Sequence, residues 1–460
     1  MKYQLIIPIS CLLAAPALAA PANFDDSSLS YDPSEEYIVL LHKAEQRGWN
    51  TVLPSIGYNI SGASINSRSA DGTQQFSTDT GISIRTFDSH IRGFTISMKR
   101  SEGEILSSHP NIAMVEKNHI VHSFVEPQDP KDVSQEITPD TASKSHSRRA
   151  LNTRQKEAPH FIYRMQINAP WNLERISSTT PPSFINHRIT DRAFEFRYPP
   201  HAGKGVDMYI LDTGLNPSNP DFHGRASMLY SAFDDNGTDE AGHGTHIAGT
   251  AASFPYGVAK SATIHGVKVL KADGKGTAET FIKGINAAIK NHNKRKSSPD
   301  FKGSVLNLSL GVFVNSDVLK SVVRTALDAG IHIAAAAGNE NRDTCGNVFP
   351  AGWSDELPVV SVGATDLNDR RAWFSNWGKC VSLFAPGVVV TSTSNNGASS
   401  VRQGTSVACP HVAGVIATEL GRRPDLRLNP RGMRDLILSR GLLKVATPPK
   451  GQLLLNNGFD

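Results

Sequence analysis

Short apolar runs alternate with amphipathic stretches over the C-terminal two thirds of the chain. Runs typical of buried strands cover 206–211, 264–270, 305–310, 331–337, 357–364 and 381–385. Between the second and third runs, 277–291 carries isoleucines at helical spacing, and 318–327 shows the same spacing of apolar residues. Strands separated by helices are typical of a parallel sheet covered by helices on both faces, with functional loops at the carboxyl ends of the strands. We therefore predict an α/β domain over 165–460, built on a mainly parallel sheet.

The N-terminal part of the chain has a different order of elements. Runs at 36–42, 94–98 and 114–121 predict strands, while 43–53 and 100–108 have helical character. This order predicts a separate small α+β domain of ferredoxin-like type over 36–124.

A stretch without apolar periodicity joins the two units. Between 125 and 160, Pro, Asp, Ser, Thr and Lys dominate, which predicts a flexible linker open to proteolytic nicking. The linker contains the dibasic pair Arg148-Arg149, so we expect a processed chain to start between 150 and 168.

Residues 1–20 have the pattern of a secretory signal peptide. A lysine at position 2 precedes an apolar core over 5–18, and small residues follow at 17–19. The core is shorter than the ~20 apolar residues of a spanning helix and contains two prolines. We therefore expect a secreted or vacuolar protein without a membrane anchor.

Composition agrees with this organisation and excludes one class of partner. The chain has 460 residues, 39% of them hydrophobic, which is enough for two to three domains with a large core. The net charge of +4 is small, and no basic stripe with interleaved aromatic residues is present. A short basic run at 294–296 follows a predicted helix and is typical of a solvated loop. Nucleic acid is therefore not an expected partner.

Small residues crowd around one serine in 403–414 (Gln-Gly-Thr-Ser-Val-Ala-Cys-Pro-His-Val-Ala-Gly). The apolar spacing that begins at Val412 predicts a helix with Ser406 in its first turn, among unpaired N–H groups at the positive end of the helix dipole. This position would stabilise negative charge on or beside the hydroxyl. An isolated serine there is usually a helix cap, so the interpretation as a nucleophile depends on two other stretches.

The first of these stretches ends in Asp212. An apolar run followed by Asp-Thr-Gly predicts a buried strand that delivers the carboxylate to the edge of the sheet. Aspartic proteases also use Asp-Thr-Gly, but there two such carboxylates share a proton, and this chain has one copy of the motif.

The second stretch contains His243, with glycines on both sides that let the backbone pass close to a substrate. The alternatives are a core histidine and a metal pair with His246. A metalloprotease helix carries two histidines four residues apart with a glutamate between them, and this pattern is missing here. We therefore expect no metal at this place.

The motifs Asp-Thr-Gly, His-Gly-Thr-His and Gly-Thr-Ser occur in the order that subtilisin uses for its Asp, His and Ser. From about Asn168 to Gly458 the chain resembles the subtilisin-like serine peptidases. The segments 168–171 (Asn-Ala-Pro-Trp), 257–259 (Gly-Val-Ala) and 374–378 (Phe-Ser-Asn-Trp-Gly) are most similar to the proteinase K branch, especially its fungal vacuolar members.

This resemblance implies a catalytic triad of Asp212, His243 and Ser406. It also implies that 36–124 is a propeptide, which assists folding and inhibits the enzyme. The last residues of that propeptide, 122–124, would lie in the active-site cleft like a substrate.

The resemblance further implies the residues that bind the substrate. Asn339 would donate its side-chain amide to the oxyanion beside the Ser406 N–H, as acyl transfer requires. The segment Ser309, Leu310 and Gly311 would pair with extended substrate by β-augmentation. The specificity pocket would be lined by Ala335, Ala336, Ala337 and Gly338. The family commonly has a second glycine after Gly311, but here Val312 follows, so the resemblance does not define the upper wall of the cleft.

The function implied is hydrolysis of proteins and peptides by a serine endopeptidase of broad specificity, through an acyl-enzyme. The enzyme would be a monomer, made as a zymogen with its own propeptide as inhibitor. The alternative is a catalytically inactive subtilase-fold binding protein. A lipase or esterase would carry Gly-x-Ser-x-Gly, whereas Ser406 is followed by Val-Ala.

Four cysteines are present, at 11, 345, 380 and 409. Cys11 leaves with the signal peptide, so one of the remaining three is unpaired. Cys345 and Cys380 lie at loop edges, where related fungal enzymes have cysteines at similar places, and we expect a disulfide between them. Cys409 lies on the predicted helix of Ser406, and we expect a buried free thiol there.

Two further expectations concern calcium and glycosylation. In the proteinase K branch an Asp ligand follows shortly after the Phe-Ser-Asn-aromatic-Gly segment, but here Ser382 stands at that place. A neutral hydroxyl is a poor ligand for a hard cation, so we expect this calcium site to be weak or absent. Asn59, Asn236 and Asn307 carry glycosylation sequons, and we expect Asn307 to be unmodified because its strand is buried.

Overall fold

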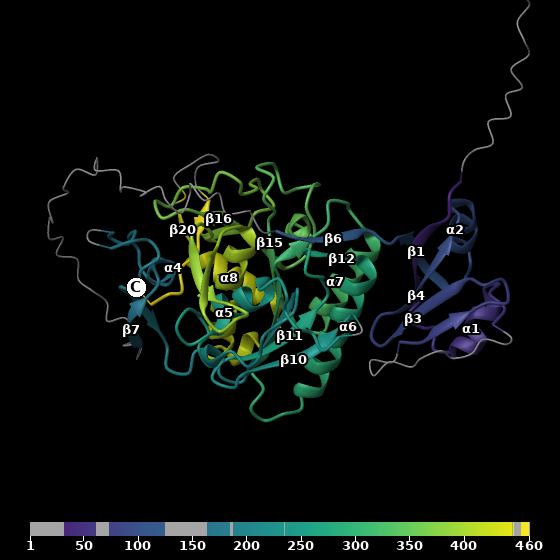
Figure 1. Cartoon of the computed structure of the whole chain (residues 1–460), viewed down its shortest axis with the longest axis horizontal. Helices are drawn as coiled ribbons and strands as arrows, with labels where there is room; N and C mark the ends of the chain where they lie inside the picture. The colour runs from purple at the N-terminus through teal and green to yellow at the C-terminus, as the bar shows by residue number, and fades with distance from the viewer. Residues whose placement is uncertain are drawn as a thin grey trace, which may run out of the picture.

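The computed structural model describes the following parts of the chain: 32–60, 73–124, 163–184, 187–233, 235–443, 445 and 452–459. The predicted signal peptide and linker, with the dibasic pair, lie outside these ranges. Figure 1 shows a small N-terminal domain beside a larger one. None of the helices in the described ranges combines the length and the apolar character needed to cross a membrane.

A nine-stranded sheet forms the centre of the larger domain, in the order β10-β11-β9-β13-β15-β16-β17-β21-β20. Neighbouring strands run parallel except for the pair β20 and β21. The predicted class, an α/β fold with a mainly parallel sheet, is therefore confirmed. In chain order the strands are β9 (Val206–Asp212), β10 (Ala226–Ser231), β11 (Thr263–Lys268), β13 (Gly303–Leu308), β15 (His332–Ala336), β16 (Val359–Thr365), β17 (Leu383–Pro386), β20 (Leu442–Leu443) and β21 (Leu453–Leu454).

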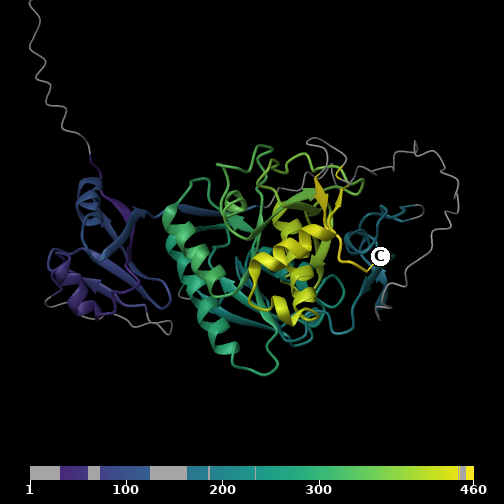
Figure 2. The same ribbon diagram turned by 180° about the vertical axis from the view of Figure 1, so that it is seen from behind.

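Helices cover both faces of this sheet because its strands alternate between two cores. On β9, Met208 and Ile210 point into one core, and Tyr209 and Leu211 point into the other. Helices α6 and α7 cover the second core and lie between the sheet and the small domain, while α8 and α9 are seen best from behind (Figure 2). The helices are α5 (His243–Ala252), α6 (Ala278–Arg295), α7 (Asp317–Asp328), α8 (Thr405–Leu420) and α9 (Pro430–Arg440).

Shorter elements complete the larger domain. Strands β7 and β8 form one two-stranded ribbon, and β18 and β19 form another. Three short 3₁₀ turns lie at Pro220–Phe222, Ala351–Trp353 and Pro424–Leu426. The remaining bounds are β7 (Arg164–Ala169), α4 (Trp171–Ile176), β8 (Phe194–Tyr198), β18 (Val390–Thr393) and β19 (Ser399–Arg402).

The small domain has its own antiparallel sheet in the order β2-β3-β4-β1-β5 and its own hydrophobic core. The helix expected at 43–53 begins later than predicted, because 43–48 is irregular, with a turn at 43–44, and α1 begins at Trp49. Its elements are β1 (Glu35–Leu41), α1 (Trp49–Ser55), β2 (Gln75–Ser77), β3 (Ser83–Asp88), β4 (Arg92–Met98), α2 (Arg100–Ser107) and β5 (Ile112–Lys117).

The single strand predicted at 114–121 is wrong, because the structure has two strands separated by Asn118 and His119. The Asn118 N–H donates to the carbonyl of Glu36 at 2.8 Å, and its side-chain oxygen accepts from the N–H of Glu279 at 3.0 Å. Asn118 thus joins the small sheet to the start of α6. The chain then continues as β6 (Ile120–Ser123), which leaves the small sheet and runs onto the large domain (Figure 1).

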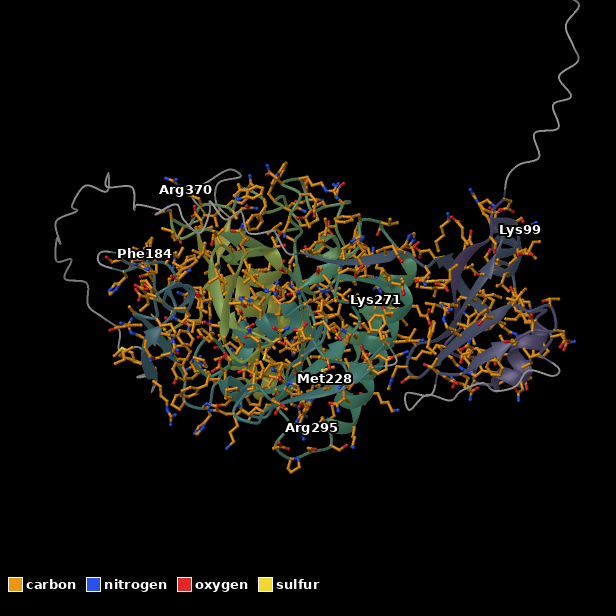
Figure 3. All side chains as sticks on the ribbon, viewed as in Figure 1. Lys99, Phe184, Met228, Lys271, Arg295 and Arg370 are labelled. Carbon is orange, nitrogen blue, oxygen red and sulfur yellow. A yellow bond between two sulfur atoms is a disulfide. The ribbon has the colours of Figure 1, made fainter. Side chains whose placement is uncertain are left out.

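Side chains of the two domains meet along α6 (Figure 3). Arg85 of β3 forms an ion pair with Glu279 at 2.7 Å. Asn286 accepts from the backbone N–H of Ile91 at 2.9 Å and donates to its carbonyl at 2.8 Å. The small domain is therefore held by specific polar contacts in addition to β6.

Candidate active site

Asp212 and His243 meet at the carboxyl edge of the large sheet. Asp212 is the last residue of β9, and His243 is the first residue of α5 after Gly242, whose φ of 73° makes the turn into the helix. The Nδ1 of His243 lies 2.6 Å from Oδ1 of Asp212, and both side chains are buried. Because Asp212 holds the proton on Nδ1, the other ring nitrogen is left as an acceptor. Within the described residues, that Nε2 atom has no hydrogen-bond partner.

Ser406 is the second residue of α8 and is fully buried. Its hydroxyl, like Nε2 of His243, is without a hydrogen-bond partner in the described part of the chain. Gly404, with a φ of 141°, brings the backbone close to this hydroxyl. A methyl group built on Gly404 would lie 2.5 Å from the carbonyl oxygen of Phe124, 3.0 Å from Ser406 Oγ and 3.2 Å from Nδ2 of Asn339. These three atoms therefore surround one point in space.

The side-chain amide of Asn339 has a fixed orientation. Its oxygen accepts from the backbone N–H and the hydroxyl of Thr405, at 2.9 and 2.8 Å. The amide nitrogen therefore faces the other way, and it donates to the carbonyl oxygen of Phe124 at 2.9 Å. The structure thus brings the predicted oxyanion donor onto a carbonyl group beside Ser406.

Strand β6 lies between two short segments of the larger domain, β12 (Lys275–Thr277) and β14 (Leu310–Gly311). On the β14 side, Leu310 pairs with Ser123 and Gly311 pairs with His122, both antiparallel. On the other side, β12 pairs antiparallel with the same strand. The sequence predicted the β14 side of this pairing and missed β12, whose short polar sequence gives no strand signal.

The ring of Phe124 is buried, with 3% of its surface exposed. It lies against Gly311, where an added methyl group would come within 2.9 Å of the ring, and it shares a hydrophobic core with Ala336. The side chain of Ala337 packs into a different core, with Phe384. Gly311 of the predicted edge segment thus lies against this ring, and Ala336 of the predicted pocket lies in the same core. The side chains of Ala335 and Ala337, which were also predicted to line the pocket, pack into other cores.

Ser309 has two connections in this region. Its carbonyl accepts from the N–H of Phe124 at 3.5 Å, which extends the β14 pairing by one residue. Its hydroxyl donates to the carbonyl of Ser406 at 2.7 Å and accepts from the amide of Asn307 at 2.9 Å. Ser309 therefore ties the edge of the cleft to the first turn of α8.

The sequence did not single out Asp239, which connects the loops of Asp212 and His243. Its buried carboxylate accepts from the hydroxyl of Thr213 at 2.7 Å and from the N–H of Gly242 at 2.8 Å. It also accepts from the N–H and the hydroxyl of Thr245, both at 2.7 Å. The one available signal was an acidic residue four positions before His243.

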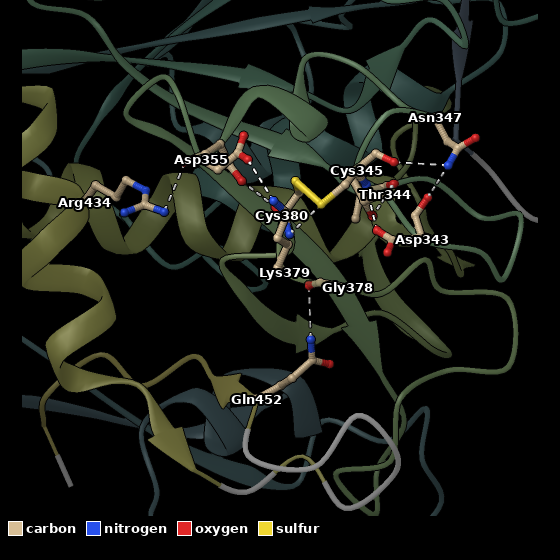
Figure 4. The surroundings of a disulfide bond; sticks show 12 residues. Asp343, Thr344, Cys345, Asn347, Asp355, Gly378, Lys379, Cys380, Arg434 and Gln452 are labelled. Carbon is tan, nitrogen blue, oxygen red and sulfur yellow. Dashed lines mark hydrogen bonds and ion pairs between the residues drawn. A yellow bond between two sulfur atoms is a disulfide. The ribbon is translucent and has the colours of Figure 1, made fainter.

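Cys345 and Cys380 form a disulfide with a Cα–Cα distance of 5.3 Å (Figure 4). Close to it, the Cys345 N–H donates to the carboxylate of Asp343 at 2.8 Å. Cys409 is a free, buried cysteine, and burial raises the pKa of its thiol. The thiol is therefore held in its protonated, unreactive form.

The described residues contain no group of three or more His, Cys, Asp or Glu side chains that could hold a metal. His246 donates from Nε2 to the carbonyl of Val390 at 3.1 Å, and burial lowers its pKa to about 3, so it is a neutral core residue. The hydroxyl of Ser382 accepts from the N–H of Ser361 at 3.1 Å. Of the sequon asparagines, Asn307 is buried, whereas Asn59 and Asn236 are exposed.

Comparison with known proteins identifies the family. The model of the subtilase family matches residues 203–451. The subtilisin-like proteinase Spm1 of Pyricularia oryzae is 38% identical over 355 residues, which are 75% of this chain and 59% of that protein. Cerevisin of Saccharomyces cerevisiae is 44% identical over 265 residues, which are 56% of this chain and 40% of that protein. The chain thus spans about half the length of these curated relatives.

A solved structure agrees with these sequence matches. The crystal structure of a cold adapted subtilisin-like serine proteinase superposes with a TM-score of 0.55 at 38% identity, covering 64% of this chain and 100% of that one. The chain therefore belongs to the subtilase family.

Proposed function

We propose that this chain is a serine endopeptidase with Asp212, His243 and Ser406 as its catalytic triad. The observation that carries the proposal is the carbonyl of Phe124, which accepts a hydrogen bond from Asn339 beside the hydroxyl of Ser406. A carbonyl held in this way, at the end of an extended strand paired on both sides, has the position of a substrate carbonyl.

In the proposed mechanism, His243 Nε2 takes the proton of Ser406, whose oxygen attacks the carbonyl of the scissile bond. Asp212 keeps the imidazole in the required tautomer and stabilises its charged form. Asn339 and the Ser406 N–H stabilise the negative charge that develops on the carbonyl oxygen. His243 then gives the proton to the leaving amine, and water hydrolyses the acyl-enzyme by the same route. Protein and peptide substrates follow from this chemistry.

We propose further that 36–124 is a propeptide and that the enzyme is made as a zymogen. Strand β6 fills the substrate position, and the rest of the small domain is held on α6 by Asn118, Arg85 and Asn286. The bond after Phe124 is then the one aligned with Ser406, and we expect the enzyme to cut itself there. A second cut in the dibasic region remains compatible with this order of events. The mature enzyme would be the monomeric domain over 165–460.

A route through the secretory pathway is the localisation that we propose, with secretion or vacuolar delivery as its end. The signal-peptide pattern at 1–20 supports this, and so does a disulfide, which persists in oxidising compartments. Exposed Asn236 would then be a glycosylation site. We propose no metal cofactor.

Labelling with a fluorophosphonate tests the proposed activity. We expect the processed chain to be labelled at Ser406 and to hydrolyse denatured protein, and we expect Ser406→Ala to abolish both. Loss of the serine costs about 10⁶ in turnover, and loss of one oxyanion donor costs about 2.7–4 kcal/mol, values measured on subtilisin, a member of this family. Ser399→Ala, on the exposed part of β19, is the matched control and should stay active.

The alternative, a catalytically inactive binding protein, predicts no labelling and equal behaviour of Ser406→Ala and the unmodified chain. N-terminal sequencing adds a second readout. A new N terminus directly after Phe124 that is absent in Ser406→Ala would support self-cleavage, whereas the same cut in both proteins would contradict it.

A further inference from the structure

Phe313 lies where the sequence left the upper wall of the cleft undefined. It follows Gly311 and Val312, at the end of the segment that pairs with β6. The backbone of Val312 exchanges two hydrogen bonds with Phe349, both of 2.9 Å, and the side chain of Val312 is buried. The backbone directly before Phe313 is therefore held by hydrogen bonds to another segment.

The ring of Phe313 contacts two rings of the segment in the cleft. Its centroid lies 5.5 Å from the imidazole of His122 and 5.9 Å from the ring of Phe124. Residues two apart on an extended strand present their side chains on the same face, so one ring of the enzyme can touch both. The interplanar angles of 39° and 60° are within the tilted arrangements that aromatic pairs favour.

Arg342 supports the same ring from the enzyme. The carbon of its guanidinium lies 5.3 Å from the Phe313 centroid, within the range of a cation–π contact. The backbone of Arg342 is fixed as well, since its N–H donates to the side chain of Asn376 at 2.9 Å and its carbonyl accepts from Trp377 at 3.0 Å. With 41% of its surface exposed, Phe313 is therefore held in place while it presents a face to the cleft.

The two substrate positions that Phe313 touches differ from the others along β6. The ring of Phe124 is buried: it contacts Phe313, lies against Gly311 and shares a core with Ala336. Val121 has no ring and is buried in an apolar core with Phe281 and Leu310. The aromatic contacts thus single out the residue before the cleaved bond and the residue two positions earlier.

We propose that Phe313 is a specificity-determining residue that selects peptides with an aromatic side chain directly before the cleaved bond and a second ring two residues earlier. The substrates preferred by this enzyme are then segments of the form ring-x-aromatic, of which His122-Ser123-Phe124 is the example within its own chain. This inference rests on the proposed peptidase function and adds a substrate class to it.

The test uses four chromogenic tetrapeptide amides, with Phe or Leu at the last position and His or Ala two residues earlier. The processed enzyme is assayed at pH 8, where the histidine of the substrate is neutral. An aromatic pair contributes roughly a two- to tenfold preference. We expect kcat/KM to be highest for the His/Phe peptide, lowest for the Ala/Leu peptide and intermediate for the other two.

Phe313→Leu, which keeps an apolar side chain and removes the ring, should lower kcat/KM for the His/Phe peptide by roughly two- to tenfold. The kcat/KM of the Ala/Leu peptide should change by less than about twofold, because that peptide has no ring that contacts Phe313. Phe313→Tyr should keep the preference of the unmodified enzyme. Phe254→Leu is the matched control, because this exposed phenylalanine stacks on His223 at 4.7 Å, and it should leave all four rates unchanged.

The inference is overturned if Phe313→Leu lowers all four values equally or leaves their ratios unchanged. It is also overturned if Phe313→Tyr loses the preference. A failure of the proposed function looks different: the unmodified enzyme would then hydrolyse none of the four peptides, and a fluorophosphonate would not label Ser406.

Discussion

Gly404 is a single residue whose lack of a side chain bears directly on the proposed chemistry. Its φ of 141° disfavours any other residue, and a methyl group would lie 2.5 Å from the carbonyl oxygen bound by Asn339. We expect Gly404→Ala to lower kcat/KM by roughly 10²-fold or more, since the substrate carbonyl could no longer reach its donor. Peptide hydrolysis and fluorophosphonate labelling measure the loss, and circular dichroism verifies the fold.

Gly397→Ala separates this effect from backbone strain. Gly397 also has a positive φ, 86°, but nothing lies within 4 Å of an added methyl group. Both variants pay a strain of order 1 kcal/mol, so only the steric block distinguishes them. Equal activity in the two alanine variants would contradict the position that we give to the substrate carbonyl.

Unlike Gly404, the buried residue Asp239 affects the site indirectly, through hydrogen bonds to residues beside Asp212 and His243. Its carboxylate accepts four hydrogen bonds, from Thr213, Gly242 and Thr245. The amide of an asparagine has only one oxygen that can accept, so it cannot replace both carboxylate oxygens. Small displacements of catalytic groups cost up to about 100-fold in rate. We therefore expect Asp239→Asn to lower kcat by roughly 10- to 100-fold with little change in KM, and to reduce the free energy of unfolding by about 1–3 kcal/mol.

The matched control is Asp235→Asn in the same loop. Asp235 is exposed and accepts from the N–H of Gly237 at 2.9 Å, so it shares the residue type but not the connection to the site. Steady-state kinetics with a short peptide and thermal unfolding check both variants. If Asp239→Asn loses stability but keeps kcat, the residue is structural and the positioning role is wrong.

At the scale of elements, α6 serves two purposes. Its inward face packs against the large sheet, whereas Asn286 and Glu279 on its outward side hold the small domain. The two hydrogen bonds between Asn286 and the backbone of Ile91 are buried, and each such bond contributes about 0.5–1.5 kcal/mol. We expect residues 36–124 added in trans to inhibit the processed enzyme, and Asn286→Ala to raise the inhibition constant roughly tenfold.

Asn291→Ala on the same helix is a suitable comparison, because its side chain accepts from the hydroxyl of Tyr209 within the larger domain. It should leave inhibition unchanged. An inhibition constant that is the same for Asn286→Ala and the unmodified enzyme would show that β6 alone carries the affinity. No inhibition at micromolar concentration would count against the propeptide assignment itself.

The sequence predicted the elements whose signal is local. Apolar runs such as 331–337 and spaced apolar residues such as those of 318–327 depend on burial within one element, so their periods are visible in the chain. The positions of Asp212, His243 and Ser406 were predicted from three motifs, each with its own small-residue context. Asp212 and His243 meet, with His243 Nδ1 2.6 Å from Asp212, because the parallel sheet collects the carboxyl ends of its strands. Ser406 lies in the first turn of α8, and a triad of the three residues stays a prediction.

Features that depend on a distant partner were missed. Nothing within 275–277 predicts a strand, because β12 exists only by pairing with β6. Residues 114–121 were predicted as one strand although four polar residues, Glu-Lys-Asn-His, lie at its centre. The break at Asn118 is fixed by hydrogen bonds to Glu36 and Glu279, which are distant in the chain. Phe313 was also missed, since the selectivity that we propose for it depends on contacts with rings of the small domain.

At the scale of the whole molecule, two histidines of the small domain lie at its junction with the larger one. The ring of His90 lies 2.6 Å from the amide nitrogen of Asn293, a contact that only a neutral, accepting nitrogen can make. Burial lowers the pKa of His90, and Lys296 and Lys43 add to this effect. Burial also lowers the pKa of His122, with Lys275 acting in the same direction and Asp273 and Glu340 opposing it.

These shifts make release of the small domain depend on pH. Lys296 near His90 and Lys275 near His122 belong to the larger domain and disfavour the protonated rings, so the bound state takes up protons less readily. The complex therefore has its full stability above the free histidine pKa of about 6.5 and weakens as the pH falls below that value. We expect the inhibition constant of residues 36–124 to rise severalfold as the pH falls from 7.5 to 5, measured with a substrate whose own rate of hydrolysis is determined at each pH.

The His90→Gln and His122→Gln double variant should show a flatter profile, since glutamine keeps hydrogen-bonding capacity without a charge. His109→Gln is the control, because this histidine contacts Ser55 inside the small domain. Inhibition that tightens toward acidic pH, or a double variant with the same slope as the unmodified domain, would contradict this account of zymogen release.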